Sequence, residues 1–257
     1  MRYIYTVVCC LLLAVTNIQA DNLTPPVSLV PCPVSIIPGT GNFHFSGKTT
    51  FAVENEGQAE QVRQFNELFA RAAGFTPRIK VGKKGDICLV TDTTLKDESY
   101  KLEITAKRIN IYAADVQGFF YALQSIRQLL PAAIEGEQVT DKIDWTVPAV
   151  TITDQPRFGY RGLLVDVARF FSPKENLLRI IDCMAMLKLN KLHLHLVDDN
   201  GWRIEIKKYP LLTEIGSRRV DRPGKNFSER HNARQGEPTV EKGFYTQDEI
   251  REIVRYA

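Results

Sequence analysis

The stretch between residues 161 and 197 constrains the fold of this chain more than any other part of the sequence. Arg161–Val167 is an almost continuous apolar run, a pattern typical of a strand that is buried on both faces of a parallel sheet. A helix is predicted after it, up to about Leu189, and Lys191–Val197 forms a second strand. Strand, helix and strand in this order predict a βαβ unit that opens an α/β domain.

Two capping boxes mark predicted helix starts in this part of the chain. Ser172, Pro173 and Glu175 supply an N-cap, a proline at the first helical position and a glutamate three residues after the cap. Thr246 and Glu249 repeat the cap and the glutamate before a final helix. We therefore expect one helix between the two strands and another at the end of the sequence.

A (β/α)8 TIM barrel consists of eight strand–helix repeats and takes about 250 residues. The sequence from Arg161 to Ala257 holds at most two or three of them. We therefore expect a truncated barrel, and expect the chain to be the N-terminal part of a longer protein.

Residues 21–157 alternate short strands with helices, which predicts a small α+β domain with helices on one face of a sheet. Its predicted elements are strands at 49–53, 78–81, 87–90, 100–104 and 109–112 and helices at 60–73 and 116–130. Residues 133–157 contain Gly136, Pro148 and Pro156 and are predicted to form a linker. No residue of this domain stands out as catalytic.

The first twenty residues have the pattern of a cleavable secretory signal. Arg2 supplies the positive charge, residues 3–15 are almost all apolar, and Ala20 provides the small residue before the cleavage point. The apolar run is shorter than the roughly 20 residues of a membrane-spanning helix. We expect an exported protein, periplasmic, at the cell surface or secreted, with no stable membrane span after cleavage.

Composition excludes some classes of partner. The chain has 33 Lys and Arg against 30 Asp and Glu, a formal net charge of +3, and no long run of one sign. This balance argues against nucleic acid as a partner and favours small-molecule or neutral-polymer chemistry. After the signal, Cys32, Cys88 and Cys183 are too few and too scattered for a disulfide framework. Cys183 is expected on the apolar face of its helix, as a small core residue.

The densest polar cluster follows the second predicted strand. His193, His195, Asp198, Asp199 and Trp202 all occur within this short stretch. Catalytic groups of α/β folds gather at the carboxyl ends of the strands, and this cluster lies at such an end.

Three interpretations of the cluster stay open. In the first, the histidines fill a barrel interior through hydrogen bonds and Asp199 begins a turn. In the second, His193 and His195 place both rings on one face of the strand and hold a zinc ion, with a further ligand from elsewhere. In the third, carboxylates and histidine bind sugar hydroxyls while Trp202 stacks on the pyranose ring. The position of Trp202 close to Asp198 suits the sugar site better.

A family resemblance rests on four segments, Arg161–Arg169, Met184–Asn190, His193–Pro210 and Gly243–Ile250. Together they resemble glycoside hydrolase family 20, the β-N-acetylhexosaminidases, and the His193–Pro210 stretch is highly specific. The segment before them, including Trp145–Ala149, resembles the non-catalytic N-terminal domain of that family.

The sequence pattern and the resemblance together divide the chain into a signal peptide at 1–20, a non-catalytic α+β domain with a linker at 21–157, and the start of a (β/α)8 catalytic domain at 158–257. The resemblance implies a retaining enzyme that hydrolyses terminal N-acetylglucosamine or N-acetylgalactosamine from the non-reducing end of glycans. In the implied mechanism, which needs no cofactor, the substrate's acetamido oxygen is the nucleophile. A glutamate donates the proton, and an adjacent aspartate orients the acetamido group.

The resemblance also implies roles for residues of this chain. Arg161 matches the arginine that binds sugar hydroxyls in the first subsite. His195 and Asp198 match supporting positions of the active site, and Asp166 is a further candidate. Phe170 stands where the family commonly has histidine. No metal ligand is implied.

The Asp–Glu catalytic pair of the family, in a His-x-Gly-Gly-Asp-Glu context, is absent from this sequence. Asp248 and Glu249 have the same letters but belong to a predicted helix cap. We expect the pair beyond residue 257, and we expect the chain alone to be inactive because general acid catalysis contributes about 10²- to 10⁴-fold. Two alternatives stay open: a metal-dependent hydrolase that uses His193 and His195, and a non-catalytic carbohydrate-binding remnant. The sequence makes no prediction of oligomeric state.

Overall fold

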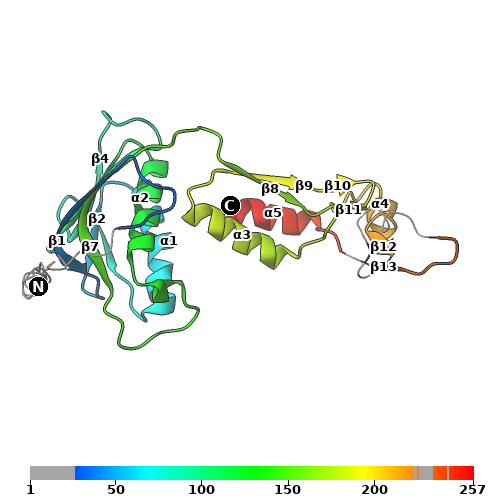
Figure 1. Ribbon diagram of the computed structural model, residues 1–257, viewed down its shortest axis with the longest axis horizontal. Helices are drawn as coiled ribbons and strands as arrows, with labels where there is room; N and C mark the ends of the chain where they lie inside the picture. Colours follow the sequence, from blue (N-terminus) through cyan, green and yellow to red (C-terminus); the bar gives the residue numbers. More distant parts are fainter. Residues whose placement is uncertain (1–26, 221, 223–224, 226–233, 242) are drawn as a thin grey trace, which may run out of the picture.

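The computed structural model describes residues 27–220, 222, 225, 234–241 and 243–257. The predicted signal peptide lies outside the described residues. Figure 1 shows two parts side by side: a sheet covered by two helices, and a smaller unit built on two parallel strands. Within the described residues, no helix is both long enough and apolar enough to span a membrane.

The first part is a seven-stranded mixed sheet with the strand order β1-β7-β5-β6-β4-β2-β3. Its strands are β1 (Ser35–His44), β2 (Thr50–Val53), β3 (Arg78–Val81), β4 (Ile87–Thr91), β5 (Tyr100–Ile104), β6 (Ile109–Ala113) and β7 (Thr146–Asp154). Its helices are α1 (Glu56–Ala72), α2 (Val116–Leu129) and the short 3-10 turn η1 (Ala132–Glu135). Both long helices lie on one face of the sheet (Figure 1), as the sequence predicts.

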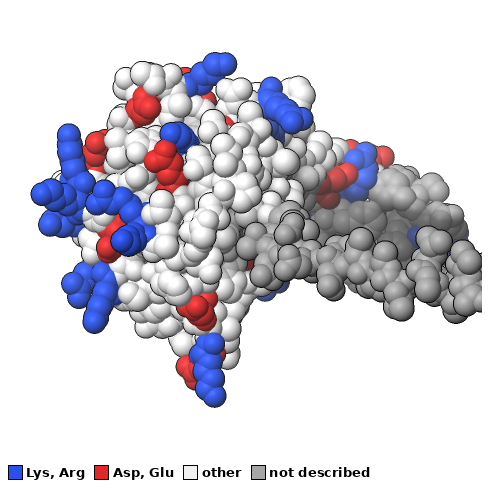
Figure 2. Space-filling model, turned by 60° about the vertical axis from the view of Figure 1, so that its left-hand side comes forward, with Lys and Arg blue, Asp and Glu red and all other residues white. Residues whose placement is uncertain are grey.

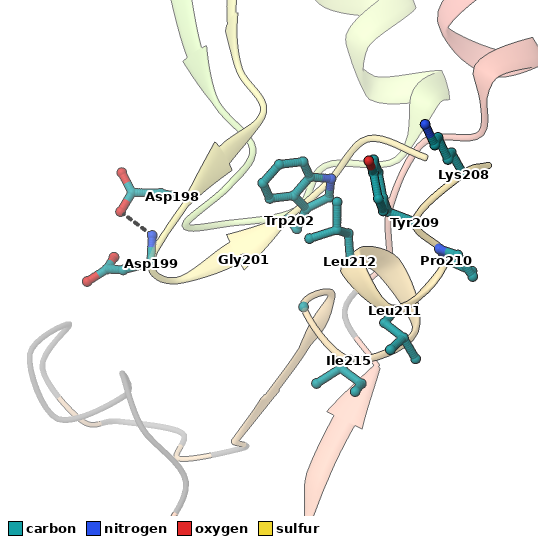
Figure 3. Close-up of a pocket in the computed structure, with 11 residues that line it drawn as sticks. Asp198, Asp199, Gly201, Trp202, Lys208, Tyr209, Pro210, Leu211, Leu212 and Ile215 are labelled. Carbon is teal, nitrogen blue, oxygen red and sulfur yellow. Dashed lines mark hydrogen bonds between the residues drawn. The ribbon is translucent and has the colours of Figure 1, made fainter. Parts of the chain in front are cut away.

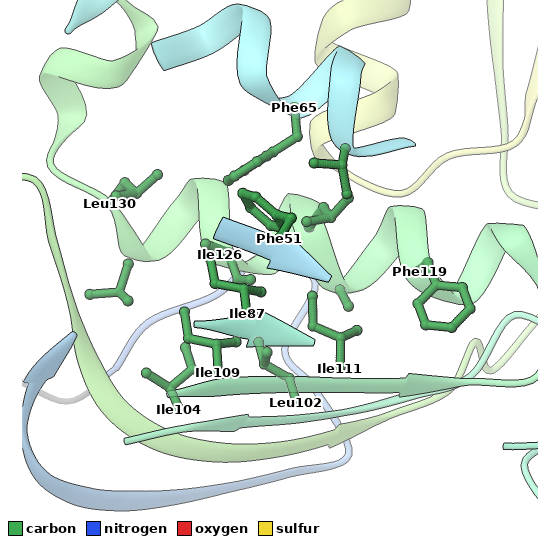
Figure 4. Packing of buried hydrophobic residues seen from close by; sticks show 14 of the residues in the cluster. Phe51, Phe65, Ile87, Leu102, Ile104, Ile109, Ile111, Phe119, Ile126 and Leu130 are labelled. Atoms are coloured by element: carbon green, nitrogen blue, oxygen red, sulfur yellow. The ribbon is translucent and has the colours of Figure 1, made fainter. Parts of the chain in front are cut away.

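Alternating buried side chains explain the strands of this sheet, and N-cap side chains explain where its two long helices begin. Leu102 and Ile104 on β5 lie opposite Ile111 and Ile109 on β6, and all four are buried against the helices (Figure 4). The side chain of Asn55 accepts a hydrogen bond from an N–H in the first turn of α1. Asp115 caps α2 in the same way. The apolar faces of the two helices therefore close one core with the sheet.

The predicted linker at 133–157 is wrong, because most of it is strand β7. This strand pairs antiparallel with β1 on one side and with β5 on the other, and Val147, Val150 and Ile152 are buried in the core. Strand β1 was not predicted either. The register of β1 against β7 shifts between Pro38 and Asn42, and Pro148 pairs at this irregularity, where the sheet tolerates a proline.

The second part contains the predicted βαβ unit. Strand β8 (Gly162–Asp166), helix α3 (Lys174–Met186) and strand β9 (Lys191–His195) follow in order, and the two strands pair in parallel. The expected burial of β8 on both faces is wrong, because Leu164 is 55% exposed. Within the described residues β8 pairs with β9 alone, so one edge of it has no sheet neighbour and no barrel is closed.

Helix α3 begins differently from the prediction. Its N-cap is Pro173 and no side chain caps it, so Ser172 does not form the expected capping box. The carbonyl of Ser172 instead accepts a hydrogen bond from the hydroxyl of Tyr245. Cys183 is exposed and not a core residue, since the face that packs on the strands carries Leu177 and other apolar side chains.

The remaining elements follow β9. They are β10 (Val197–Asp198), β11 (Gly201–Trp202), α4 (Leu211–Glu214), β12 (Arg218–Val220), β13 (Thr239–Glu241) and α5 (Gln247–Tyr256). Helix α5 starts with the predicted capping box of Thr246 and Glu249. It packs beside α3 and contributes Ile253 to the apolar cluster under β8 and β9.

A buried polar junction joins the two parts. Lys188 Nζ, just after α3, lies 3.0 Å from Asp154 Oδ2 at the end of β7 and donates to the Tyr100 hydroxyl at 2.9 Å. Burial lowers the pKa of Lys188 and raises that of Tyr100. Helix α2 adds a hydrogen bond from the Gln128 amide to the carbonyl of Met186, 2.9 Å away. The βαβ unit is therefore fixed to the first part by side chains of three elements.

On the outer face of the first part, acidic and basic side chains are interspersed (Figure 2). The described surface in this view carries no broad area of a single charge.

Candidate functional site

Four charged side chains meet where β8 and β9 end. Asp166 and His195 are register partners at the carboxyl ends of the two strands. Arg169 follows β8 by one short turn, and Asp198 lies on β10 directly after β9. The parallel pairing of β8 and β9 brings these segments to the same edge, which is the functional edge of α/β folds. We call Asp166, Arg169, His195 and Asp198 the charged cluster.

The guanidinium of Arg169 joins the two carboxylates of the charged cluster. Its Nη1 lies 2.6 Å from Asp166 Oδ2, and its Nη2 lies 2.9 Å from Asp198 Oδ2. His195 lies between the same carboxylates, with Nε2 3.1 Å from Asp198 Oδ2 and Nδ1 3.7 Å from Asp166 Oδ2. Each carboxylate therefore has one arginine and one histidine neighbour, and the cluster is fixed by mutual contacts.

Within the charged cluster, Asp166 and Arg169 favour each other's ionised form. Burial tends to raise the pKa of Asp166, but hydrogen bonds from the backbone and side chain of Arg169 and the arginine's charge lower it overall. The carboxylate of Asp166 in turn raises the pKa of Arg169. Side chains of this kind offer N–H donors and carboxylate acceptors that match the hydroxyls of a neutral polar ligand.

An apolar pocket of about 830 Å³ opens beside the charged cluster. Figure 3 shows Asp198 and Asp199 on one side of it and Trp202 and Tyr209 on another, with Leu211 and Ile215 from the α4 region below. Trp202 Nε1 donates to the carbonyl of Ile204 at 2.8 Å, which fixes the orientation of the indole. Of the charged cluster, Asp198 is the member that lines this pocket.

The structure does not bring Arg161 to the charged cluster. Arg161 precedes β8 and so lies at its opposite, amino end. Its Nη1 lies 3.0 Å from Glu98 Oε2, its Nη2 donates to the Tyr121 hydroxyl at 2.7 Å, and its Nε donates to the Lys188 carbonyl at 2.9 Å. With a side chain only 13% exposed, Arg161 joins the βαβ unit to the first part of the chain.

Arg169 is the functional candidate that the sequence reasoning missed. A usable signal was present, since Arg169 follows the carboxyl end of a predicted strand and Arg161 precedes its amino end. Phe170, the neighbouring departure from the family pattern, is 61% exposed.

Of the two histidines on β9, His195 belongs to the charged cluster. His193 is exposed and makes no part of the charged cluster. Across the described ranges, no group of three or more His, Cys, Asp or Glu side chains is placed to hold a metal ion. Asp248 and Glu249 lie in the first turn of α5, where Glu249 completes the cap and Asp248 pairs with Arg251, as expected of a helix start.

Two family descriptions match successive parts of the chain. Residues 27–155 match "Glycosyl hydrolase family 20, domain 2". Residues 158–257 match "Glycosyl hydrolase family 20, catalytic domain". The junction between the two matches coincides with the segment that connects β7 to β8.

Among curated proteins, a beta-hexosaminidase of Porphyromonas gingivalis is 34% identical over 261 residues, covering 97% of this chain and 32% of that protein. A beta-hexosaminidase of Vibrio vulnificus is 31% identical over 245 residues, covering 95% of this chain and 27% of that protein. The chain thus spans about a third of the length of these relatives.

Solved structures show the same relationship. The N-acetyl-beta-hexosaminidase of Streptomyces plicatus, solved with Thio-NAglucal, superposes with a TM-score of 0.75 at 33% identity, covering 90% of this chain and 44% of that chain. The exo beta-N-acetylglucosaminidase of Vibrio harveyi, solved with N-acetylglucosamine, gives a TM-score of 0.73 at 33% identity, covering 89% of this chain and 34% of that chain. The chain therefore belongs to glycoside hydrolase family 20, and by family it is a glycoside hydrolase.

Proposed function

We propose that the protein is a β-N-acetylhexosaminidase that removes terminal N-acetylglucosamine or N-acetylgalactosamine from the non-reducing end of glycans. The observation that carries this proposal is the charged cluster of Asp166, Arg169, His195 and Asp198 beside the Trp202 pocket, in a chain of family 20. Relatives named beta-hexosaminidase and the N,N'-diacetylchitobiase of Vibrio harveyi support the substrate class.

Within this function, Arg169 is the arginine that we assign to the sugar hydroxyls, in place of Arg161. Its side chain is 36% exposed at the carboxyl edge of the strands, and its guanidinium is held in place by two carboxylates. It can donate to a hydroxyl oxygen while Asp198 accepts from a neighbouring hydroxyl. Trp202 supplies an apolar ring for the sugar face. Because the charges are fixed before the ligand arrives, little ordering is needed on binding.

Catalysis in this proposal is substrate-assisted, with the acetamido oxygen of the sugar attacking its own anomeric carbon. The chain supplies sugar-binding and supporting groups. The proton-donating glutamate and the orienting aspartate have no His-x-Gly-Gly-Asp-Glu counterpart in this sequence. We propose that they come from the rest of a (β/α)8 barrel that β8 and β9 begin. We also propose export, supported by the signal pattern of residues 1–20.

The test is hydrolysis of p-nitrophenyl N-acetyl-β-glucosaminide by the complete reading frame that encodes this sequence. We expect hydrolysis that a chelator does not affect. Arg169→Met should abolish binding of N-acetylglucosamine, whereas the matched variant Arg161→Met should lower stability and leave affinity within a few fold. Activity that is lost with chelator and restored by zinc would contradict the proposal, and so would an Arg169→Met enzyme with wild-type KM.

A further inference from the structure

One buried cation of the second part is not explained by the site described so far. The side chain of Arg203, directly after β11, has no exposed surface. Its Nε and Nη2 donate to the carbonyl of Ala168 at 3.2 and 3.1 Å. Its Nη1 donates to the carbonyls of Ser217 at 2.7 Å and Gly243 at 3.0 Å. All four of these hydrogen bonds go to backbone carbonyl oxygens of three separate segments.

Such a burial is unfavourable for a charged group. Desolvation, with a smaller contribution from the charge of Arg219, lowers the pKa of Arg203 to about 10. A buried charge is normally compensated by an opposite charge, and apolar side chains of similar volume often stabilise a core as well as buried ions do. The dipoles of carbonyl groups solvate this guanidinium instead. Stability alone therefore gives little reason for an arginine here.

The space around the guanidinium is shaped to its outline. A Cβ at Gly201 would lie 2.6 Å from Arg203 Cζ, so a side chain there would displace the guanidinium. The ring of Phe171 covers it from another side, with the centroid 5.9 Å from Cζ. The backbone of Arg203 is fixed as well, since its N–H donates to the Leu196 carbonyl at 2.9 Å and its carbonyl accepts from Tyr245 at 2.8 Å.

What Arg203 holds is the segment that carries Arg169. The N–H of Ala168 donates to the His195 carbonyl at 3.0 Å, and its carbonyl accepts the two bonds from Arg203. The N–H of Arg169 donates to Asp166 Oδ1 at 3.0 Å. Arg203 therefore fixes the peptide group immediately before the Arg169 Cα, and this group sets the direction in which the Arg169 side chain leaves the backbone.

A second buried arginine completes this arrangement. Arg219 on β12 donates from Nη1 to the carbonyl of Arg169, and its Nη2 donates to Asn200 Oδ1 at 3.3 Å. Each backbone polar group of Ala168 and Arg169 thus has a hydrogen-bond partner outside these two residues. The backbone of the short turn after β8 is therefore hydrogen-bonded at both residues, although the turn belongs to no helix or strand.

We propose that Arg203 is a positioning residue for hexosamine binding, which holds Arg169 in the orientation that meets Asp198. Arg203 lies behind the Ala168 peptide and acts on the sugar only through Arg169. The inference rests on the proposed function, because it takes Arg169 as the sugar-binding group. Without the Arg203 guanidinium, the Ala168 carbonyl loses both hydrogen bonds. The 168–169 peptide should then rotate and shift the Arg169 guanidinium away from Asp198.

The test compares two variants of Arg203 with a matched control in the same chain. Arg203→Met removes the charge and the guanidinium N–H donors but keeps an unbranched side chain of similar length. Arg203→Lys keeps the charge, but its single ammonium group reaches fewer carbonyls. The control is Arg127→Met, since Arg127 is also largely buried, at 13% exposure, and pairs with Glu135 in the first part. One readout is the ¹H–¹⁵N signal of the Arg169 side-chain Nε–H. The other is the dissociation constant for N-acetylglucosamine.

We expect Arg203→Met to move the Arg169 Nε–H signal and to weaken N-acetylglucosamine binding about 10-fold or more, the loss of one charge-assisted hydrogen bond. Arg203→Lys should show a smaller change in both, and Arg127→Met should change neither. An unmoved Arg169 signal in a folded Arg203 variant would overturn the proposal. If neither Arg203 variant gives a native circular-dichroism spectrum, Arg203 is a stability residue and the proposal also fails.

The same measurements separate the two proposals. If the unmodified chain and the complete reading frame both fail to bind N-acetylglucosamine while Arg203→Met moves the Arg169 signal, Arg203 still orients Arg169, but its role in hexosamine binding falls together with the proposed function. If binding is present and Arg203→Met leaves both readouts unchanged, the function stands and the positioning role is wrong.

Discussion

Replacing Glu98 by glutamine should loosen the attachment of the βαβ unit to the seven-stranded sheet. The Glu98 carboxylate lies between two segments of the second part: Arg161 approaches with Nη1 and Nη2 at 3.0 and 3.3 Å, and Asn190 with Nδ2 at 3.4 Å. Tyr121 of α2 donates its hydroxyl at 3.4 Å. Glutamine keeps the shape and one acceptor oxygen, so the change removes mainly the charge.

The expected loss follows from the burial of this ion pair. The side chains of Arg161 and Glu98 are 13% and 24% exposed, so solvent screens their attraction only in part. A hydrogen bond to a charged group contributes about 1.5 to 3 kcal/mol. We expect Glu98→Gln to lower the free energy of unfolding by about 2 kcal/mol, or about 4–8 °C in unfolding temperature for a chain of this size.

The pH dependence supplies a second check. Hydrogen bonding from Arg161 is the largest of the effects that together lower the pKa of Glu98 below its ordinary value of 4.5. A carboxylate with a lowered pKa in the folded state stabilises the protein above the unfolded-state pKa, and this contribution is lost as the pH falls through the folded-state pKa. The difference between wild type and Glu98→Gln should therefore be full at neutral pH and shrink below about pH 4.5.

The assay is urea unfolding of Glu98→Gln, Arg161→Met and the double variant. Fluorescence reports both parts, because Trp145 lies in the core of the first part and Trp202 lies in the second. We expect a coupling energy of about 1 to 2 kcal/mol between the two substitutions. The reasoning would be refuted if the two losses in free energy of unfolding added to within about 0.5 kcal/mol in the double variant. It would also be refuted if the loss caused by Glu98→Gln did not change with pH.

Three further substitutions test other features. Gly118→Ala should destabilise by about 1 to 3 kcal/mol in thermal unfolding, because the new Cβ would lie 2.8 Å from Ala113 Cβ and collide with the Ser99 carbonyl. Thr246→Ala should cost about 1 kcal/mol by removing the α5 cap, with Thr246→Ser close to wild type. Lys188→Met should destabilise by about 3 kcal/mol, since it leaves a buried carboxylate unpaired, and Asp154→Asn in the same chain should recover part of the loss.

Local patterns predict the elements that depend on neighbouring residues. The β5–β6 hairpin and helix α2 follow from alternation, helical spacing and the cap at Asp115, all of which act within a few residues. Strands β1 and β7 depend on pairing between distant segments, and the glycine and proline residues of both strands resemble a loop. The sequence signal for a loop was real, but the sheet accommodates these residues at an irregular register.

The functional site also has features that a local pattern predicts and features that depend on distant segments. The family and the position of Asp198 and His195 could be predicted because the His193–Pro210 motif is specific, and the comparisons confirm the family. The choice between Arg161 and Arg169 depends on which end of β8 each one occupies and on what lies opposite. Glu98, the partner of Arg161, is 63 residues away in the sequence, so no local pattern could have revealed it.

The order of strands in the large sheet also determines when it can form during synthesis. Among the described strands β1 pairs with β7 alone, and β7 is the last strand of the sheet to leave the ribosome. His44 at the end of β1 and Asp144 just before β7 are 100 residues apart. At about 5–20 residues per second, the nascent chain carries an unpaired β1 for about 5 to 20 s. The parallel strands and the β5–β6 hairpin can fold in that interval, while the backbone groups of β1 still lack their β7 partners and are open to pairing with other chains.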